Sequence, residues 1–317
     1  MVNFRFHLVS LIAVFLALGL GILTGSAVVN QATVRTIRAE IKDVRNEVNS
    51  LRGENGRLGD ELGRTNAFMA DAATFAVDGR LTDVPVAVVA ERGVNGDAVN
   101  DTLTLVRAAG AVAPVVVWLE DKWKLESEQD VQALRDATGL LGGANSVRER
   151  ALDQLAERLT ATATSRSTTD APPDLLKRLS DAGFIGIDGD QAALATYPPT
   201  AARALAITGT NSTFAGSDFT TQVVRSLIGA GAPSVLGEVF VQHDGKDAAQ
   251  RGDAVAAIRS DKTMSTMVST VDDLDLVQGR VAGVLALQDL GDGTVGHYGY
   301  GRGADASLPA PRQSEQQ

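Results

Sequence analysis

The side chains in this sequence that could bind a transition metal are two methionines and two histidines. Met264 and Met267 lie three residues apart, and thioether sulfurs suit Cu(I). His297 lies in the glycine-rich segment GDGTVGHYGYGRG, which could present its imidazole to a ligand, and His243 lies upstream. Methionines at helical spacing are more often packing residues, and a histidine in a glycine-rich turn more often makes one backbone hydrogen bond. The four residues are therefore candidates for a copper site only.

Other chemistry has little support in the sequence. Asp272, Asp273 and Asp275 could hold a hard cation, but their spacing matches no calcium loop, so a solvated helix start is the preferred interpretation. The absence of cysteine excludes disulfides, thiolate nucleophiles and cysteine-based metal sites. There is no GxSxG motif or supported Ser/His/Asp triad. We therefore expect no enzyme and no resident cofactor.

No phosphate-binding pattern follows the first predicted strand. The apolar run Val84 to Ala90 is followed only by Gly93 and Gly96, without GxGxxG or a P-loop lysine, which predicts a plain strand-to-helix turn. The net charge of −10 and the pI near 4.8 argue against a nucleic-acid partner, because such proteins cluster lysine and arginine.

The elements that position these residues alternate between apolar runs and helical patterns, which is typical of an α/β fold with a largely parallel sheet. Strands are expected at 84–90, 112–119, 184–187, 204–208 and 234–241. Helices are expected at 97–109, 147–159, 174–182, 219–228 and 247–259. The predicted organisation is an anchor at 1–30, a coiled coil at 31–72, an α/β domain at 79–305 that includes a loop at 160–173, and a disordered tail at 306–317.

The N-terminal segment from Leu8 to Val29 has no charged residue and would form roughly 33 Å of helix, enough to span a bilayer. A cleavable signal peptide is the alternative, since Gly25-Ser26-Ala27 could be a cleavage site, but the apolar run is long for a signal. A retained transmembrane helix is preferred. The positive charges on its two sides leave the topology undecided, because the arginines after the span also fit the heptad pattern described next.

A heptad pattern begins at Val34 and continues to Met69. The a and d positions are apolar except Asn55 and Thr65, and the predicted dimer interface takes Val34, Ile37, Ile41, Val44, Val48, Leu51, Asn55, Leu58 and Leu62 from them. In a parallel pair, Glu40 at g faces Arg45 at e, and Glu47 faces Arg52. Asn55 at an a position favours two strands. The pattern predicts a parallel homodimeric coiled coil, and an amphipathic helix lying on its own domain is the alternative.

Four glycines interrupt the distal half of this pattern, at positions Gly53, Gly56, Gly59 and Gly63. Each costs about 0.8–1 kcal/mol relative to alanine inside a helix, yet none occupies a or d. We expect the seam to persist on a weakened helix, which could be a hinge or a docking surface.

The whole arrangement resembles the actinobacterial MctB family of copper transport proteins. The resemblance is strongest in HLVSLIAVFLALGLGILTGS near the N-terminus and in STVDDLDLVQGRVAGVLALQDLGDGTVGHYG near the C-terminus. It implies a cell-envelope protein in copper efflux or homeostasis, anchored in the cytoplasmic membrane with the bulk of the chain extracytoplasmic. Members implicated in cell separation imply an alternative, a scaffold or regulator that recruits or activates a cell-wall hydrolase.

Overall fold

The computed structural model describes residues 4–112, 115–160, 174–189, 203–214, 218–242 and 249–310, with the side chains of 26–32 outside the description. The chain divides into two compact units, Met1–Asn66 and Ala67–Gln317. Residues 161–173 of the loop predicted at 160–173, and residues 311–317 of the tail predicted at 306–317, lie outside the described residues.

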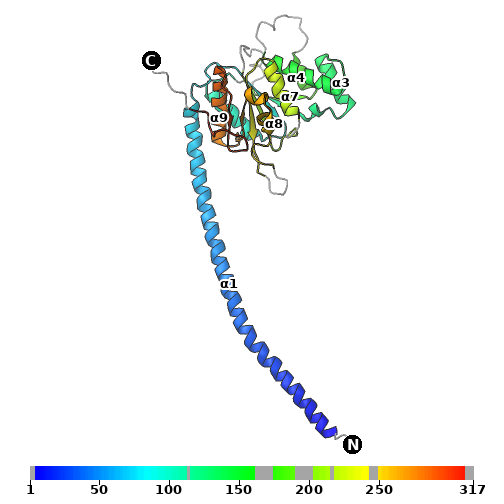
Figure 1. The fold of residues 1–317 in the computed structure, drawn as a ribbon, viewed down its shortest axis with the longest axis vertical. Helices are drawn as coiled ribbons and strands as arrows, with labels where there is room; N and C mark the ends of the chain where they lie inside the picture. Colours follow the sequence, from blue (N-terminus) through cyan, green and yellow to red (C-terminus); the bar gives the residue numbers. More distant parts are fainter. Residues whose placement is uncertain are drawn as a thin grey trace. The chain divides into compact units, whose positions relative to one another are not determined.

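The first unit is helical throughout its described part. Helix α1 begins at Phe4 and ends at Val77, so its last turns belong to the second unit (Figure 1). The predicted apolar and heptad segments are thus parts of one helix, which continues through Gly53, Gly56, Gly59 and Gly63. An added Cβ at each of these four glycines would meet no other atom within 4 Å.

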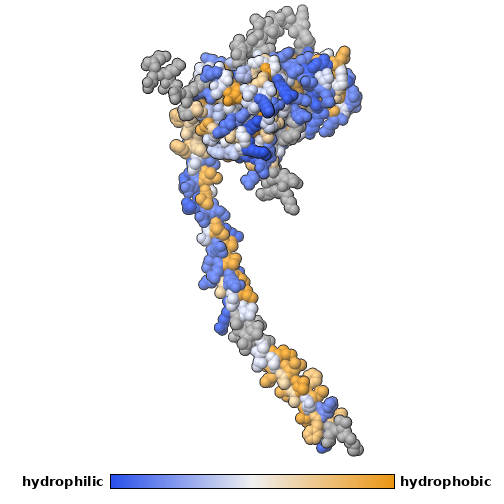
Figure 2. Space-filling model, viewed as in Figure 1, coloured by the Kyte–Doolittle hydropathy of each residue, from blue (hydrophilic) through white to orange (hydrophobic). Residues whose placement is uncertain are grey.

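One segment in the described part of the chain, Phe4–Gly25, is long and apolar enough to cross a membrane by length and composition. A signal sequence has the same properties. Figure 2 shows mainly apolar side chains on the visible face of this segment, whereas the stretch that follows presents an apolar stripe beside polar side chains.

The second unit is built on a seven-stranded sheet of order β3-β2-β1-β4-β5-β6-β7. Every neighbouring pair is parallel except β2 with β3, which is antiparallel. The largely parallel sheet predicted from the sequence is confirmed. The strands are β1 (Val86–Glu91), β2 (Val115–Leu119), β3 (Ile185–Gly189), β4 (Arg203–Gly209), β5 (Ser234–Val239), β6 (Val268–Val271) and β7 (His297–Tyr298).

Helices cover both faces of this sheet, which explains why its central strands are apolar at almost every position. On one face α3, α4, α5, α7 and α8 pack over Val89, Val117 and Leu236. On the other face α2, α9 and the end of α1 pack over Val88, Leu205 and Val235. The helices of the second unit are α2 (Gly96–Ala108), α3 (Glu128–Thr138), α4 (Ala144–Thr160), α5 (Leu175–Asp181), α7 (Asp218–Gly229), α8 (Ala256–Ser260) and α9 (Val277–Asp289), with short 3₁₀ turns η1 (Asp121–Lys124), η3 (Met264–Thr266) and η4 (Leu290–Asp292).

The five strands and four of the five helices expected from the sequence are present with small shifts at their ends. The prediction of a helix at 247–259 is wrong over most of its described part, because 249–250 has no regular structure, 251–255 forms turns and only α8 is helical. Gly252 adopts a φ of +94° there and its N–H donates to Glu238, a geometry that a helix would not allow. The sequence pattern did not predict α3, β6, α9 or β7.

The strand order reverses between β1 and β4, where open α/β sheets usually bind ligands. Here the two loops at this point pack directly on each other: Thr213 N–H donates to the carbonyl of Arg92 at 3.1 Å, and a Cβ at Gly93 would lie 2.2 Å from the carbonyl oxygen of Asn211. Gly93 lies in the expected strand-to-helix turn, with φ at +96°. The crevice at the reversal is therefore filled by backbone.

Replacing Gly93 by alanine should destabilise the second unit, because the methyl group would clash with the Asn211 carbonyl on a backbone that only glycine adopts easily. We expect a loss of about 2 kcal/mol or more in the free energy of unfolding. Gly96→Ala is the matched control, because Gly96 starts α2 with open space around it. Denaturant unfolding of the full chain in detergent would compare the two, and equal stabilities would contradict the packing described.

Candidate functional site

The predicted interface side chains lie on α1 with most of their surface exposed. Leu51 is 54% exposed, and Ile37, Ile41, Val44, Val48, Leu58 and Leu62 are also exposed. Asn55 is exposed too, and Val34 is half-buried. A long apolar stripe exposed to water on a protein surface usually marks an interaction site.

The charged residues that flank this stripe are available for a partner. Among the described residues, Glu40, Arg45, Glu47 and Arg52 form no ion pair within their own helix. Arg57 and Glu61 do pair along the helix at 3.1 Å, but both are exposed, and such i,i+4 pairs contribute only about 0.3–0.5 kcal/mol.

In the second unit, polar side chains gather at the carboxyl ends of the parallel strands. Glu91 ends β1 and is buried, and it accepts hydrogen bonds from Thr208 and Thr220 at 2.6 Å each and from Ser212. Burial raises the pKa of Glu91, and the three hydroxyl donors partly offset this rise. The hydrogen bonds of the Glu91 carboxyl group therefore connect β1, β4 and α7 at the point where the strand order reverses.

A second group of buried charges follows β5 and β6. Asp272 and Arg259 are both buried and pair at 2.8 Å, and Arg251 pairs with Asp275 through two bonds of 2.8 and 2.9 Å. Asp272 also accepts from the backbone N–H groups of Tyr300 and Gly301. These aspartates do lie just before a helix, α9, but the prediction that they are solvated is wrong, because Asp272 and Asp273 are fully buried.

This group explains the glycine-rich segment around His297. A Cβ at Gly299 would lie 2.2 Å from the Asp272 carboxylate, and one at Gly301 would collide with the backbone of Arg251. Glycine is therefore needed at these two positions because the backbone of the segment passes close to Asp272 and to Arg251.

The metal candidates are placed in different environments. Met264 is 5% exposed and lies in the core, as the packing interpretation predicted, whereas Met267 is 43% exposed. His297 is on strand β7 and not in a loop, and its Nδ1 lies 2.9 Å from Thr270 Oγ1. It also contacts the backbone of Ser265, and burial lowers its pKa. His243 lies outside the described residues.

No cluster of three His, Cys, Asp or Glu side chains suited to a metal ion is found in the part of the chain that the structure describes. Met264, Met267, His243 and His297 remain candidates as predicted.

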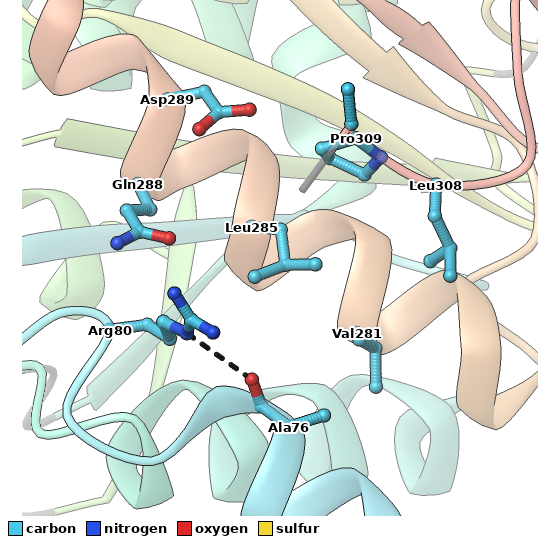
Figure 3. A pocket seen from close by; sticks show the side chains of 9 residues that line it. Ala76, Arg80, Val281, Leu285, Gln288, Asp289, Leu308 and Pro309 are labelled. Carbon is cyan, nitrogen blue, oxygen red and sulfur yellow. Dashed lines mark hydrogen bonds between the residues drawn. The ribbon is translucent and has the colours of Figure 1, made fainter. Parts of the chain in front are cut away.

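Beside the end of α1, a groove of about 350 Å³ runs along α9 (Figure 3). Its walls include Ala76, Val281, Leu285 and Leu308, and Arg80 caps the helix end by donating to the carbonyl of Ala76 at 3.4 Å. The groove follows from packing a helix end on α9, and its walls carry mainly apolar groups.

The buried Glu238 should make the stability of the second unit depend on pH. Burial is the main cause that raises its pKa to about 8, with the nearby Asp272 adding to the rise and Arg251 and Arg259 opposing it. The folded state therefore holds a proton that the unfolded state loses near pH 4.5, so the stability due to this group is lost as pH rises from about 4.5 to about 8. Asp273, whose pKa burial raises to about 7, acts in the same direction.

Glu238→Gln should remove this dependence, because glutamine keeps an acceptor for the Gly252 N–H without a charge. We expect the variant to melt higher than the wild type by roughly 5 °C at about pH 8.5 and by little at about pH 5. Near-UV circular dichroism of the full chain in detergent would measure the melting temperatures, with the exposed Glu149→Gln as the control. A difference that does not change with pH would refute this account of Glu238.

Comparison with known proteins gives one consistent result. The family described as "Copper transport outer membrane protein, MctB" matches residues 1–309. "Copper transporter MctB" of Mycobacterium leprae (strain TN) is 31% identical over 329 residues, covering 98% of this chain and 100% of the relative. "Copper transporter MctB" of Mycobacterium tuberculosis (strain ATCC 25618 / H37Rv) is 28% identical over 322 residues, covering 96% and 98%. The chain therefore belongs to the MctB family.

Proposed function

We propose that this chain is a membrane-anchored cell-envelope protein that works as a parallel two-stranded coiled-coil dimer in copper efflux or homeostasis. The observation that carries the proposal is the exposed heptad stripe of α1, directly following an apolar stretch of the same helix. The copper role rests on the family and on relatives that are named copper transporters. The apolar stretch would be a single-pass anchor in the cytoplasmic membrane, with the rest of the chain extracytoplasmic.

Heptad counting sets the length of the proposed coiled coil. The seam residues after Thr65 are Met69 and Ala72, which are half-buried in the second unit, and the neighbouring Ala73 and Val77 are buried in its core. One stripe cannot pack on a second helix and on its own domain at the same positions. The dimer seam should therefore end near Thr65, and not at Met69.

Leu51→Asp should break the dimer, because it places a charge in the centre of the proposed seam. We expect the wild type to run as a dimer and the variant as a monomer in light scattering of the full chain in detergent. Ser50→Asp is the matched control, because it adds the same charge one residue away at a position outside the seam. A wild type that is monomeric at high concentration, or a variant that stays dimeric, would argue against the coiled coil.

A second candidate function is the non-enzymatic scaffold that recruits or activates a cell-wall hydrolase. The observation that favours it is the placement of the metal candidates: Met264 is in the core, and His297 is bonded to Thr270 on a strand. Neither is arranged as an open copper site, whereas the stripe on α1 is an interaction surface. If the chain is such a scaffold, its second unit and α1 would hold a partner protein of the cell envelope in position.

Cells that carry Leu51→Asp or Ser50→Asp in place of the wild type can separate the two functions. The copper proposal expects growth at raised copper to be lost in cells lacking the chain and in the Leu51→Asp strain, with normal cell separation. The scaffold proposal expects chained cells with normal copper tolerance. Normal copper tolerance in cells lacking the chain would reject the copper role, and normal cell separation in those cells would reject the scaffold.

A further inference from the structure

A cavity of about 340 Å³ opens at the carboxyl ends of β2 and β4, on the face of the sheet covered by α4 and α7. Its walls come from three places in the sequence. Trp123 and Lys124 lie in the η1 turn after β2, Arg148 is on α4, and Phe214, Asp218 and Phe219 follow β4. It is next to the strand-order reversal, whose central crevice is filled by backbone.

Two side chains that line this cavity carry buried donors without acceptors. Trp123 is fully buried, and its indole Nε1–H has no hydrogen-bond partner among the described residues. The Nε of Arg148 is also buried and unpaired there, although its Nη2 donates to Asn145. An unsatisfied buried donor costs about 1–3 kcal/mol, so two of them beside one cavity indicate that an acceptor group belongs there.

Buried side-chain atoms without a partner also occur elsewhere among the described residues, but Trp123 and Arg148 share the lining of one cavity. The indole N–H of Trp118 donates to Asp188 Oδ2 at 2.6 Å, so the fold satisfies one of its two tryptophans. Trp123 differs because it packs against aromatic rings. The centroid of its ring lies 5.4 Å from that of Phe184, which is edge-on, and 6.1 Å from that of Phe219.

The charges and rings at the cavity define the ligand further. Lys124 and Arg148 are cations, and Asp218 is the acidic residue in the lining. Phe214 and Phe219 are stacked with their centroids 4.2 Å apart, and the Lys124 ammonium lies 5.8 Å from the Phe214 ring. The two cations and the two unpaired donors favour an anionic ligand. The carboxylate of Asp218 disfavours a ligand with a second negative charge. The stacked phenylalanine rings favour a ligand that also has a flat apolar group.

We propose that this cavity binds a small organic monoanion, in which a carboxylate accepts from Trp123 Nε1 and Arg148 Nε and a flat apolar group packs against Phe214 and Phe219. The volume is within the range of about 300–1,000 Å³ that is usual for small-molecule sites. None of these residues belongs to the heptad stripe or to the metal candidates. The site therefore stands apart from the dimer and from copper.

Tryptophan fluorescence of the full chain in detergent can test the site directly. In a Trp118→Phe background, Trp123 is the only tryptophan, so its emission reports on the cavity alone. Benzoate and phenylacetate are the probes, acetate is the anion without a flat body, and benzyl alcohol is the flat body without a charge. We expect saturable changes with at least one aromatic acid and binding at least about tenfold weaker for acetate and benzyl alcohol.

Arg148→Gln should weaken binding of the aromatic acid by about tenfold or more, because it removes the cation and the buried Nε donor. Arg150→Gln is the matched control on the same helix, since Arg150 is exposed and donates to the carbonyls of Ser146 and Leu141 outside the cavity. Far-UV circular dichroism would check that both variants fold. The proposal is overturned if neither acid saturates below about 10 mM, if acetate or benzyl alcohol binds equally well, or if folded Arg148→Gln binds like the wild type.

Discussion

The second unit depends on how a sheet covered on both faces accommodates polar groups at the ends of its strands. Glu91 ends β1, Glu238 is the last residue but one of β5, Asp272 follows β6, and all three are buried. Burying an unpaired carboxylate is costly, so each must be neutral, hydrogen-bonded or paired. Hydroxyl groups satisfy Glu91, Arg259 and backbone N–H groups satisfy Asp272, and Glu238 favours its protonated form.

The loops of the unit follow from this constraint. The turn at Gly252 brings a backbone N–H to Glu238, and the segment at Gly299 and Gly301 brings its own backbone against Asp272. Glycine is needed at these approaches because a Cβ would occupy the space of the carboxylate or of the neighbouring backbone. What resembled a ligand-presenting loop is a strand and a turn that enclose a buried ion pair. One hollow at this edge of the sheet is the cavity of Trp123, whose lining carries two buried donors that have no acceptor among the described residues.

Helix α1 is subject to different constraints along its length. Its first part is apolar enough for a bilayer, its middle carries a narrow apolar stripe with charges beside it, and its last turns pack into the core of the second unit. In water the middle part would leave the stripe exposed, which is unfavourable for a long helix unless a partner covers it. A second copy of the same helix fits the alternation of glutamate at g with arginine at e, and this is why the dimer is the proposal that we favour for this segment.

The sequence by itself determined the features that depend on local periodicity. The central strands could be predicted because apolar β-branched runs such as Val115 to Val117 have few other uses, and the apolar and heptad segments of α1 could be read from charge and spacing. Helix α9 was missed because it is apolar on nearly every side, so it carries no amphipathic period. Only the tertiary structure decided that Asp272 and Asp273 are buried and that the Trp123 indole N–H has no acceptor among the described residues. Whether a polar group has a partner depends on residues distant in sequence, which no local pattern contains.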